Sequence, residues 1–235
     1  MTQPADLSVT RDQVIQGALM VVGYLDPATP PTTQDITWCS LKLNYYIKYL
    51  QTKGLPLWMW RDLEIPMVVN QSSYTIGGTG NIVTDRPLRV TSAFIRDSLG
   101  NDTSLVTLTR QEYDILGSKT TPGVPNQFYY DPQLPNGILN VYGVPTDNTY
   151  TIHAQVQVPI ATLNSASDIP EFPNEWYYLL ETGLADAIAL QYQAPANVRQ
   201  ELAVRSRTLL NEMLDWSQEW ASVYMSPDAQ FMPGG

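Results

Sequence analysis

The sequence predicts an α+β fold, in which a helical bundle built from the N- and C-terminal helices carries an inserted antiparallel domain of the β-sandwich or barrel-like kind. Apolar residues recur with the helical period near both ends of the 235-residue chain, whereas its middle consists of short apolar runs separated by Gly, Asn, Asp and Pro. We therefore expect a helical bundle from residues 1–62 and 163–224, a β domain from residues 63–162, and an extended tail from residues 225–235.

The first two helices are predicted from residues that cap helix starts. Thr10 with Gln13, and Thr32 with Asp35, have the spacing of a capping box, in which the two side chains each accept a hydrogen bond from the other residue's backbone. Gly54 is placed to end the second helix. The apolar stripe predicted for that helix consists of Ile36, Cys39, Leu43, Ile47 and Leu50.

The middle of the chain contains seven runs typical of strands: "LEIPMVV", "SYTI", "LRVTSAFIRD", "SLVTL", "QFYYD", "ILNVYG" and "YTIHAQVQV". Strict alternation in the last run predicts a half-buried antiparallel strand with His153 on its polar face. Between "QFYYD" and "ILNVYG", Asn136-Gly137 is expected to supply the positive φ angles of a tight hairpin. Residues 109–123 predict one short helix and a loop that cross the sheet.

Helical periodicity returns near the C-terminus. Pro173 suits the first turn of a helix that Pro195 breaks. The last helix is expected over about residues 196–224, which corresponds to roughly 40 Å at 1.5 Å per residue. Trp216 and Trp220 fall on its apolar stripe, so we expect them in the core of the bundle.

Composition points to assembly. Charged residues make up 15% of the chain, below the roughly 25% that is usual, and a weakly charged, Tyr-rich surface suits permanent contact with neighbours. The net charge of −10 disfavours sequence-independent binding to phosphate backbones, although a channel wall that repels DNA would have the same sign. Cys39 is the only cysteine, which excludes an internal disulfide and indicates a reducing compartment. We expect neither secretion by the standard route nor a membrane span.

Few residues have a pattern that indicates catalysis. His153 has no motif around it, and we interpret it as a solvent-facing strand residue. A pair of catalytic carboxylates could come from the three acids Asp168, Glu171 and Glu175, but acids before a helix more often complement its dipole. The run "IGGTGN" lacks the Lys and helix of a phosphate loop and indicates a turn. We expect no catalytic residue, no cofactor and no metal. The aromatic residues that could stack on a ligand, and that we instead expect in a core or interface, are Trp58, Trp60, Tyr129 and Tyr130.

The order and spacing of several motifs resemble those of the head-to-tail adaptor proteins of short-tailed bacteriophages, also called tail tubular protein A or tail accessory factors. The resemblance covers about residues 10–224. It is carried by Arg86-Pro87-Leu88-Arg89, by Gly-x-Pro at 123–125, by Tyr-Tyr-Asp-Pro at 129–132, and by Glu-x-x-Tyr-x-Leu-x-x-Gly-Leu-Ala at 175–185.

The resemblance implies a structural virion protein rather than an enzyme. Such proteins form a dodecameric ring beneath the portal, with the helical part against the portal and the β domain facing the tail nozzle and the tailspikes or fibres. Double-stranded DNA passes through the ring without specific binding. The expected location is the head-tail interface of the virion, and the host cytoplasm during assembly. By position and composition, Tyr224, Phe231 and Met232 are expected to anchor the chain to the portal.

Three alternatives stay open. One is another head- or tail-completion ring protein, although such proteins are usually smaller and lack so large a β insertion. Another is a carbohydrate-binding module that uses Trp58 and Tyr129. The third is a muralytic hydrolase, an activity credited to some adaptors; it would require Glu171 or Glu175 in a cleft with a second carboxylate roughly 5–10 Å away.

Overall fold

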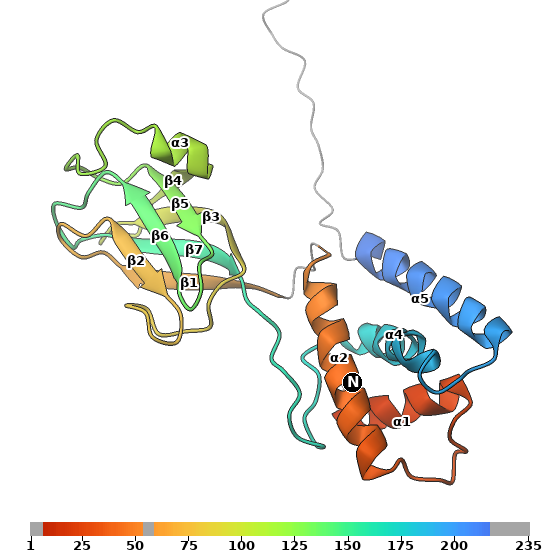
Figure 1. The fold of residues 1–235 in the computed structure, drawn as a ribbon. Coiled ribbons are helices and arrows are strands. Elements are labelled where there is room, and N and C mark those ends of the chain that lie inside the picture. The colour runs from red at the N-terminus through yellow and green to blue at the C-terminus, as the bar shows by residue number, and fades with distance from the viewer. Residues whose placement is uncertain (1–6, 54–58, 217–235) are drawn as a thin grey trace, which may run out of the picture.

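The computed structural model describes residues 7–53 and 59–216 of the chain. Within these residues the fold is mixed α/β, with five α-helices and one curled sheet of seven strands (Figure 1). The predicted fold class is therefore wrong in two respects. The strands form one curled sheet with a parallel pair and not an antiparallel sandwich, and the predicted bundle of N- and C-terminal helices is not shown.

The first two helices begin where their capping residues predict. α1 spans Arg11–Val22 and α2 spans Thr33–Gln51, and both capping boxes are present. Gly23 ends α1 in the left-handed conformation, with φ 82°, which costs a glycine little. The predicted stop of α2 at Gly54 lies outside the described residues, and the helix itself ends at Gln51.

The remaining long helices are arranged around α4. α4 (Tyr177–Ala189) follows a short 3₁₀ turn, and α1, α2 and α5 (Ala196–Trp216) each pack against it (Figure 1). Gly183 allows α2 to approach closely, because a Cβ at this position would overlap the ring of Tyr46. α4 is consequently buried on almost every side.

The bundle prediction fails because periodicity shows that a helix has an apolar side, but not which helix that side meets. In the described part of α5 only Leu202 and Ser206 are buried. Trp216 is 66% exposed rather than in a core. The predicted continuation of this helix to residue 224, with Trp220, lies outside the described residues.

The seven strands are ordered β1-β7-β3-β4-β5-β6-β2. All neighbouring pairs are antiparallel except β4 and β5, which are parallel. The connection between those two strands contains α3 (Arg110–Asp114), and a connection of this length lets β5 begin at the same end of the sheet as β4. The strands are β1 (Trp60–Pro66), β2 (Ser73–Ile76), β3 (Arg89–Arg96), β4 (Asp102–Thr107), β5 (Gln127–Asp131), β6 (Gly137–Tyr142) and β7 (Thr151–Gln157).

The predicted hairpin around Asn136-Gly137 forms, but by a different turn. β5 and β6 pair antiparallel, yet neither Asn136 nor Gly137 has a positive φ. Asn136 instead bonds to Thr79, whose hydroxyl accepts from its amide at 2.9 Å. Gly137 is required for space, because a Cβ there would overlap the hydroxyl of Tyr130.

The sheet connects to the helices through two neighbouring strands. Trp60 pairs with Gln157, and the N–H of Val158 donates to the carbonyl of Met59 at 3.0 Å. One apolar core lies among the helices and another lies within the sheet. Whether these cores belong to independently folding domains with the predicted boundaries stays a prediction.

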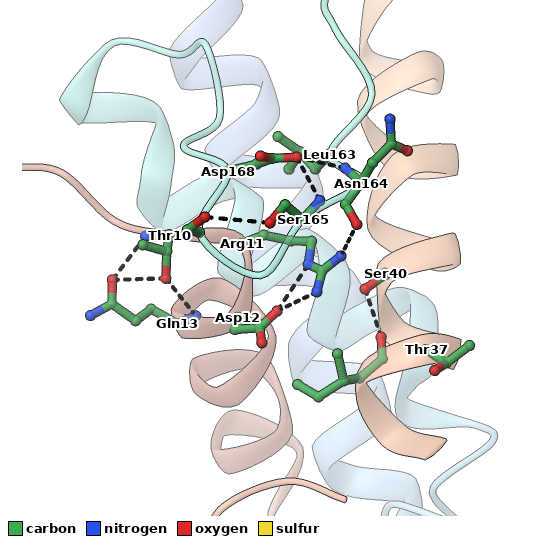
Figure 2. A network of polar contacts seen from close by, with 12 residues as sticks. Thr10, Arg11, Asp12, Gln13, Thr37, Ser40, Leu163, Asn164, Ser165 and Asp168 are labelled. Carbon is green, nitrogen blue, oxygen red and sulfur yellow. Dashed lines mark hydrogen bonds and ion pairs between the residues drawn. The ribbon is translucent and has the colours of Figure 1, made fainter. Parts of the chain in front are cut away.

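The segment that follows β7 returns along the helices and is fixed by polar contacts (Figure 2). The amide of Asn44 donates to the carbonyl of Leu163 at 3.1 Å and accepts from its N–H at 2.9 Å. Arg11 donates to the carbonyl of Asn164 at 2.9 Å. The Asp168 carboxylate accepts from the N–H of Asn164 at 2.7 Å. These bonds hold the chain against α1 and α2 before it enters α4.

Candidate interaction surfaces

One side of α2 carries large apolar side chains that its own fold leaves uncovered. Trp38, Leu41, Tyr45 and Tyr49 are 42%, 41%, 60% and 47% exposed. Their spacing of three, four and four residues places them along one line of the helix, opposite the buried residues that pack on α4. We call these four residues the α2 stripe. The apolar pattern of the sequence predicted only the buried stripe, although the same periodicity in the Trp and Tyr residues could have revealed this second one.

Lysines border the α2 stripe. The Lys42 ammonium lies 4.8 Å from the centroid of the Trp38 ring, and that of Lys53 lies 4.7 Å from the Tyr49 ring. Residues 36–61 contain four Lys or Arg and no Asp or Glu, so the other 9 of the 13 cations accompany all 23 carboxylates. Lys42 and Lys53 therefore give the aromatic α2 stripe a cationic border, on a chain whose net charge is −10.

A hollow of about 680 Å³ lies at the N-terminal end of the stripe, lined by Tyr24, Asp35, Trp38, Tyr192 and their neighbours. The Tyr192 hydroxyl donates to the Asp35 carboxylate at 2.8 Å, and the Trp38 indole donates to Gln191 at 2.6 Å. Burial raises the pKa of Asp35, but hydrogen bonds from Thr32 and Tyr192 outweigh it and leave this pKa below its ordinary value. The hollow is thus held by bonds between the start of α2 and the end of α4.

Cys39 lies beside this network. Its sulfur is 3.6 Å from the Tyr192 hydroxyl, and its side chain is fully buried. Burial raises the pKa of the Cys39 thiol, which keeps it in the unreactive form.

A groove of about 650 Å³ lies where the chain enters α4. Its lining includes the exposed apolar residues Leu7 and Ile169, together with Glu171, Asn174 and Glu175. Both glutamates are exposed. We call this hollow the acidic groove.

Of the three acids that the sequence suggested, only Glu171 and Glu175 line the acidic groove. Asp168 instead closes a turn by accepting hydrogen bonds from the N–H groups of Ser165 and Asn164, which lower the pKa of Asp168 (Figure 2).

The interpretation of His153 as solvent-facing is wrong. It does lie on the polar side of β7, but it is only 5% exposed. Phe94 of β3 stacks on its ring at 4.9 Å, and a carboxylate oxygen of Asp62 in β1 lies 3.3 Å from Nδ1. Because β7 has a strand on each side, long neighbours on both strands cover its polar side.

The other aromatic residues contribute to packing. Trp60 packs against the helical core. Tyr130 donates to the carbonyl of Pro87 at 2.7 Å, and Tyr129 stacks on Tyr113 with ring centroids 5.4 Å apart. The "IGGTGN" run forms a turn after β2, as expected. Trp58 lies outside the described residues, as do the predicted portal anchors Tyr224, Phe231 and Met232.

Neither a metal site nor a membrane span is found among the described residues. No three or more His, Cys, Asp or Glu side chains gather there in a way that could hold a metal ion. None of the described helices combines the length and apolarity of a membrane span.

Comparison of the chain with models of known protein families gives no match, and comparison with curated protein sequences gives none either.

Proposed function

We propose that the chain is a structural virion protein, the head-to-tail adaptor of a short-tailed bacteriophage. It forms a ring between the portal and the tail nozzle and continues the channel through which DNA leaves the capsid. The motif order described above suggests the family, and the α2 stripe is the structural observation that carries the proposal. A helix that leaves Trp38, Tyr45 and Tyr49 half-exposed in one line has the residues that protein interfaces favour.

The size of the α2 stripe supports assembly on a template. Aromatic side chains bury roughly 150–250 Å² each, so three half-exposed rings supply about 300 Å². A stable interface buries about 800 Å² per partner. Copies held side by side on the portal would need far less intrinsic affinity, because tethering raises their effective concentration. The portal is therefore the proposed template for twelve copies.

The distribution of charge supports a DNA channel. Outside residues 36–61 the chain has 14 more carboxylates than cations, and such a surface repels phosphates instead of retaining them. In the proposed ring, the helices face the portal and the sheet faces the nozzle and the tailspikes or fibres.

A muralytic hydrolase is the second candidate, because Glu171 and Glu175 line one groove. A glycosidase needs one of its two carboxylates to stay protonated, which burial usually achieves. Both glutamates are exposed, and this favours the adaptor. Clearing of cell walls in a zymogram, abolished by Glu171→Gln or Glu175→Gln, would reverse the preference.

Native mass spectrometry of the full chain, alone and mixed with the portal ring of the same genome, tests the proposal. The expected result is a discrete gain of about twelve copies that requires the portal. Replacing Tyr45 and Tyr49 by Ser should abolish this gain. The control Val204→Ser removes an exposed apolar residue from α5, at 68% exposure, and should leave the gain intact. A chain that stays monomeric beside the portal contradicts the adaptor proposal.

A further inference from the structure

At Tyr45 and Tyr49 the α2 stripe is a ridge, because the surface of a single helix is convex, whereas Trp38 and Leu41 line the hollow beside Tyr192. To lose its exposed area to water it needs a hollow with apolar walls and negative charge. The acidic groove has both properties, since Leu7 and Ile169 are 56% and 49% exposed and two glutamates lie beside them. Its described lining comes from residues 7–8 and 169–177 and includes no α2 residue, so a copy does not fill its own groove with its own stripe.

We infer that the α2 stripe of one copy docks into the acidic groove of the next copy. In this contact Lys42 and Lys53 meet Glu171 and Glu175, while the rings enter between the apolar residues of the groove. The inference rests on the proposed function, because it takes a ring neighbour as the partner. It adds which two surfaces meet.

Charge decides for a second copy rather than for DNA. Nucleic acid that stacks on aromatic rings normally lies in a cationic groove that follows its backbone. Here the cations border a ridge, and the rest of the molecule carries an excess of 14 carboxylates. Each further copy therefore offers the negative surface that Lys42 and Lys53 require.

Charge also decides against a symmetric contact. If two copies met stripe to stripe, the lysines that border one stripe would face the lysines that border the other. Like charges at an interface are unfavourable. Stripe to groove is a contact between two different surfaces. Contacts of that kind leave a stripe and a groove free at the two ends of any pair, which is what a ring or a filament requires.

Disulfide trapping between two variants, each with one introduced cysteine, tests the contact. One full-length chain carries Tyr45→Cys in the middle of the stripe, and the other carries Asn174→Cys in the groove. Native Cys39 is fully buried and does not compete. Oxidation of the mixture with copper phenanthroline should give a mixed dimer. Its yield should be at least about tenfold higher than in a control mixture of Thr208→Cys, an exposed position on α5, with Asn174→Cys. Circular dichroism of each variant establishes that it is folded.

Charge reversal provides a second and more decisive test of the contact. Adding Lys42→Glu and Lys53→Glu to the Tyr45→Cys chain should lower the mixed dimer about tenfold. Adding Glu171→Lys and Glu175→Lys to the Asn174→Cys chain should restore it, which a merely destabilised surface would not do. Failure to restore, or dominance of dimers of Tyr45→Cys with itself, overturns the inference. The inference is also overturned if the unaltered chain retains DNA and the substitutions Lys42→Glu and Lys53→Glu abolish that retention.

The two proposals fail separately. If the portal gathers about twelve copies but trapping on that assembly gives no mixed dimer, the contact is wrong and the adaptor stands. If the mixed dimer forms and the portal gathers no copies, the contact stands between copies of a different kind of assembly.

Discussion

α4 and α2 use apolar residues in different ways. α4 is in contact with α1, α2 and α5, so its apolar side chains are explained by folding. α2 packs on one side and carries a second apolar line on the other, where four large side chains are 41–60% exposed. Part of the hydrophobicity of α2 therefore has no role in the isolated fold. Such residues indicate a partner, and this separation of roles can be tested.

The largest expected effect comes from replacing a leucine by alanine in α4, compared with the same replacement in the α2 stripe. Leu180 in α4 is fully buried, and Leu41 in α2 is 41% exposed. Leu180→Ala should lower the free energy of unfolding by about 2–5 kcal/mol, because it removes buried methyl groups and leaves a cavity. Leu41→Ala should change it by less than about 0.5 kcal/mol. Urea denaturation measures both free energies, and an equal loss in the two variants would show that Leu41 also stabilises the isolated fold.

The contact at which α2 crosses α4 should be the next most sensitive. Gly183→Ala places a methyl group against the ring of Tyr46, and overpacking of this kind costs about 1–3 kcal/mol. In a Tyr46→Ala background the further cost of Gly183→Ala should shrink, since the ring is gone. A double-mutant cycle from thermal or urea unfolding gives the coupling. Additive losses would mean that the two residues do not meet.

A smaller effect is expected at the hydrogen bond between Tyr192 and Asp35. Tyr192→Phe removes a hydroxyl that donates to a carboxylate at 2.8 Å, which should cost about 1.5 kcal/mol at neutral pH. The folded pKa of Asp35 lies below its ordinary value of 3.8. The contribution of the ionised Asp35 carboxylate to stability is therefore complete above pH 3.8 and is lost as the pH falls through the lower folded pKa. The difference between the two chains should vanish in strong acid, as followed by unfolding at several pH values.

The smallest effect has the opposite sign and concerns α4 itself. Burial raises the folded pKa of Glu181 above its ordinary value of 4.5, so the charged form destabilises the fold at neutral pH. That penalty disappears as the pH falls through the raised pKa towards 4.5. Glu181→Gln should therefore raise the melting temperature at pH 7 and have no such benefit in acid. A variant that is less stable at pH 7 would show that the carboxylate has a stabilising partner.

The local structure of the chain was largely predictable because its signals are local. Capping boxes fix where α1 and α2 begin, and their residues lie three positions apart. The short helix expected within residues 109–123 is present as α3. The parallel pairing of β4 with β5 was missed, since it depends on the path of the connection between them. The same limit explains His153, whose burial depends on β7 having a neighbour on each side.

The candidate surfaces were predictable only in part. Glu171 and Glu175 could be named from the sequence, but their groove depends on Leu7, which is distant in the chain. The α2 stripe was readable in principle from Trp38, Tyr45 and Tyr49. It was overlooked because a helix was expected to have a single apolar side. The portal anchors stay predictions.

The pairing of Trp60 with Gln157 has a consequence for how the chain could have acquired its sheet. The entry and the exit of a segment of nearly one hundred residues, 60–157, are direct neighbours. For the helices, the whole sheet is therefore equivalent to a short hairpin loop. Once the sheet has folded, the entropy of closing this loop depends on the positions of its two ends and not on the number of residues between them. A turn that joins Met59 directly to Val158 would meet the same geometric requirement. The position of this pair therefore allows the segment between residues 60 and 157 to differ in length without moving the two ends that meet the helices.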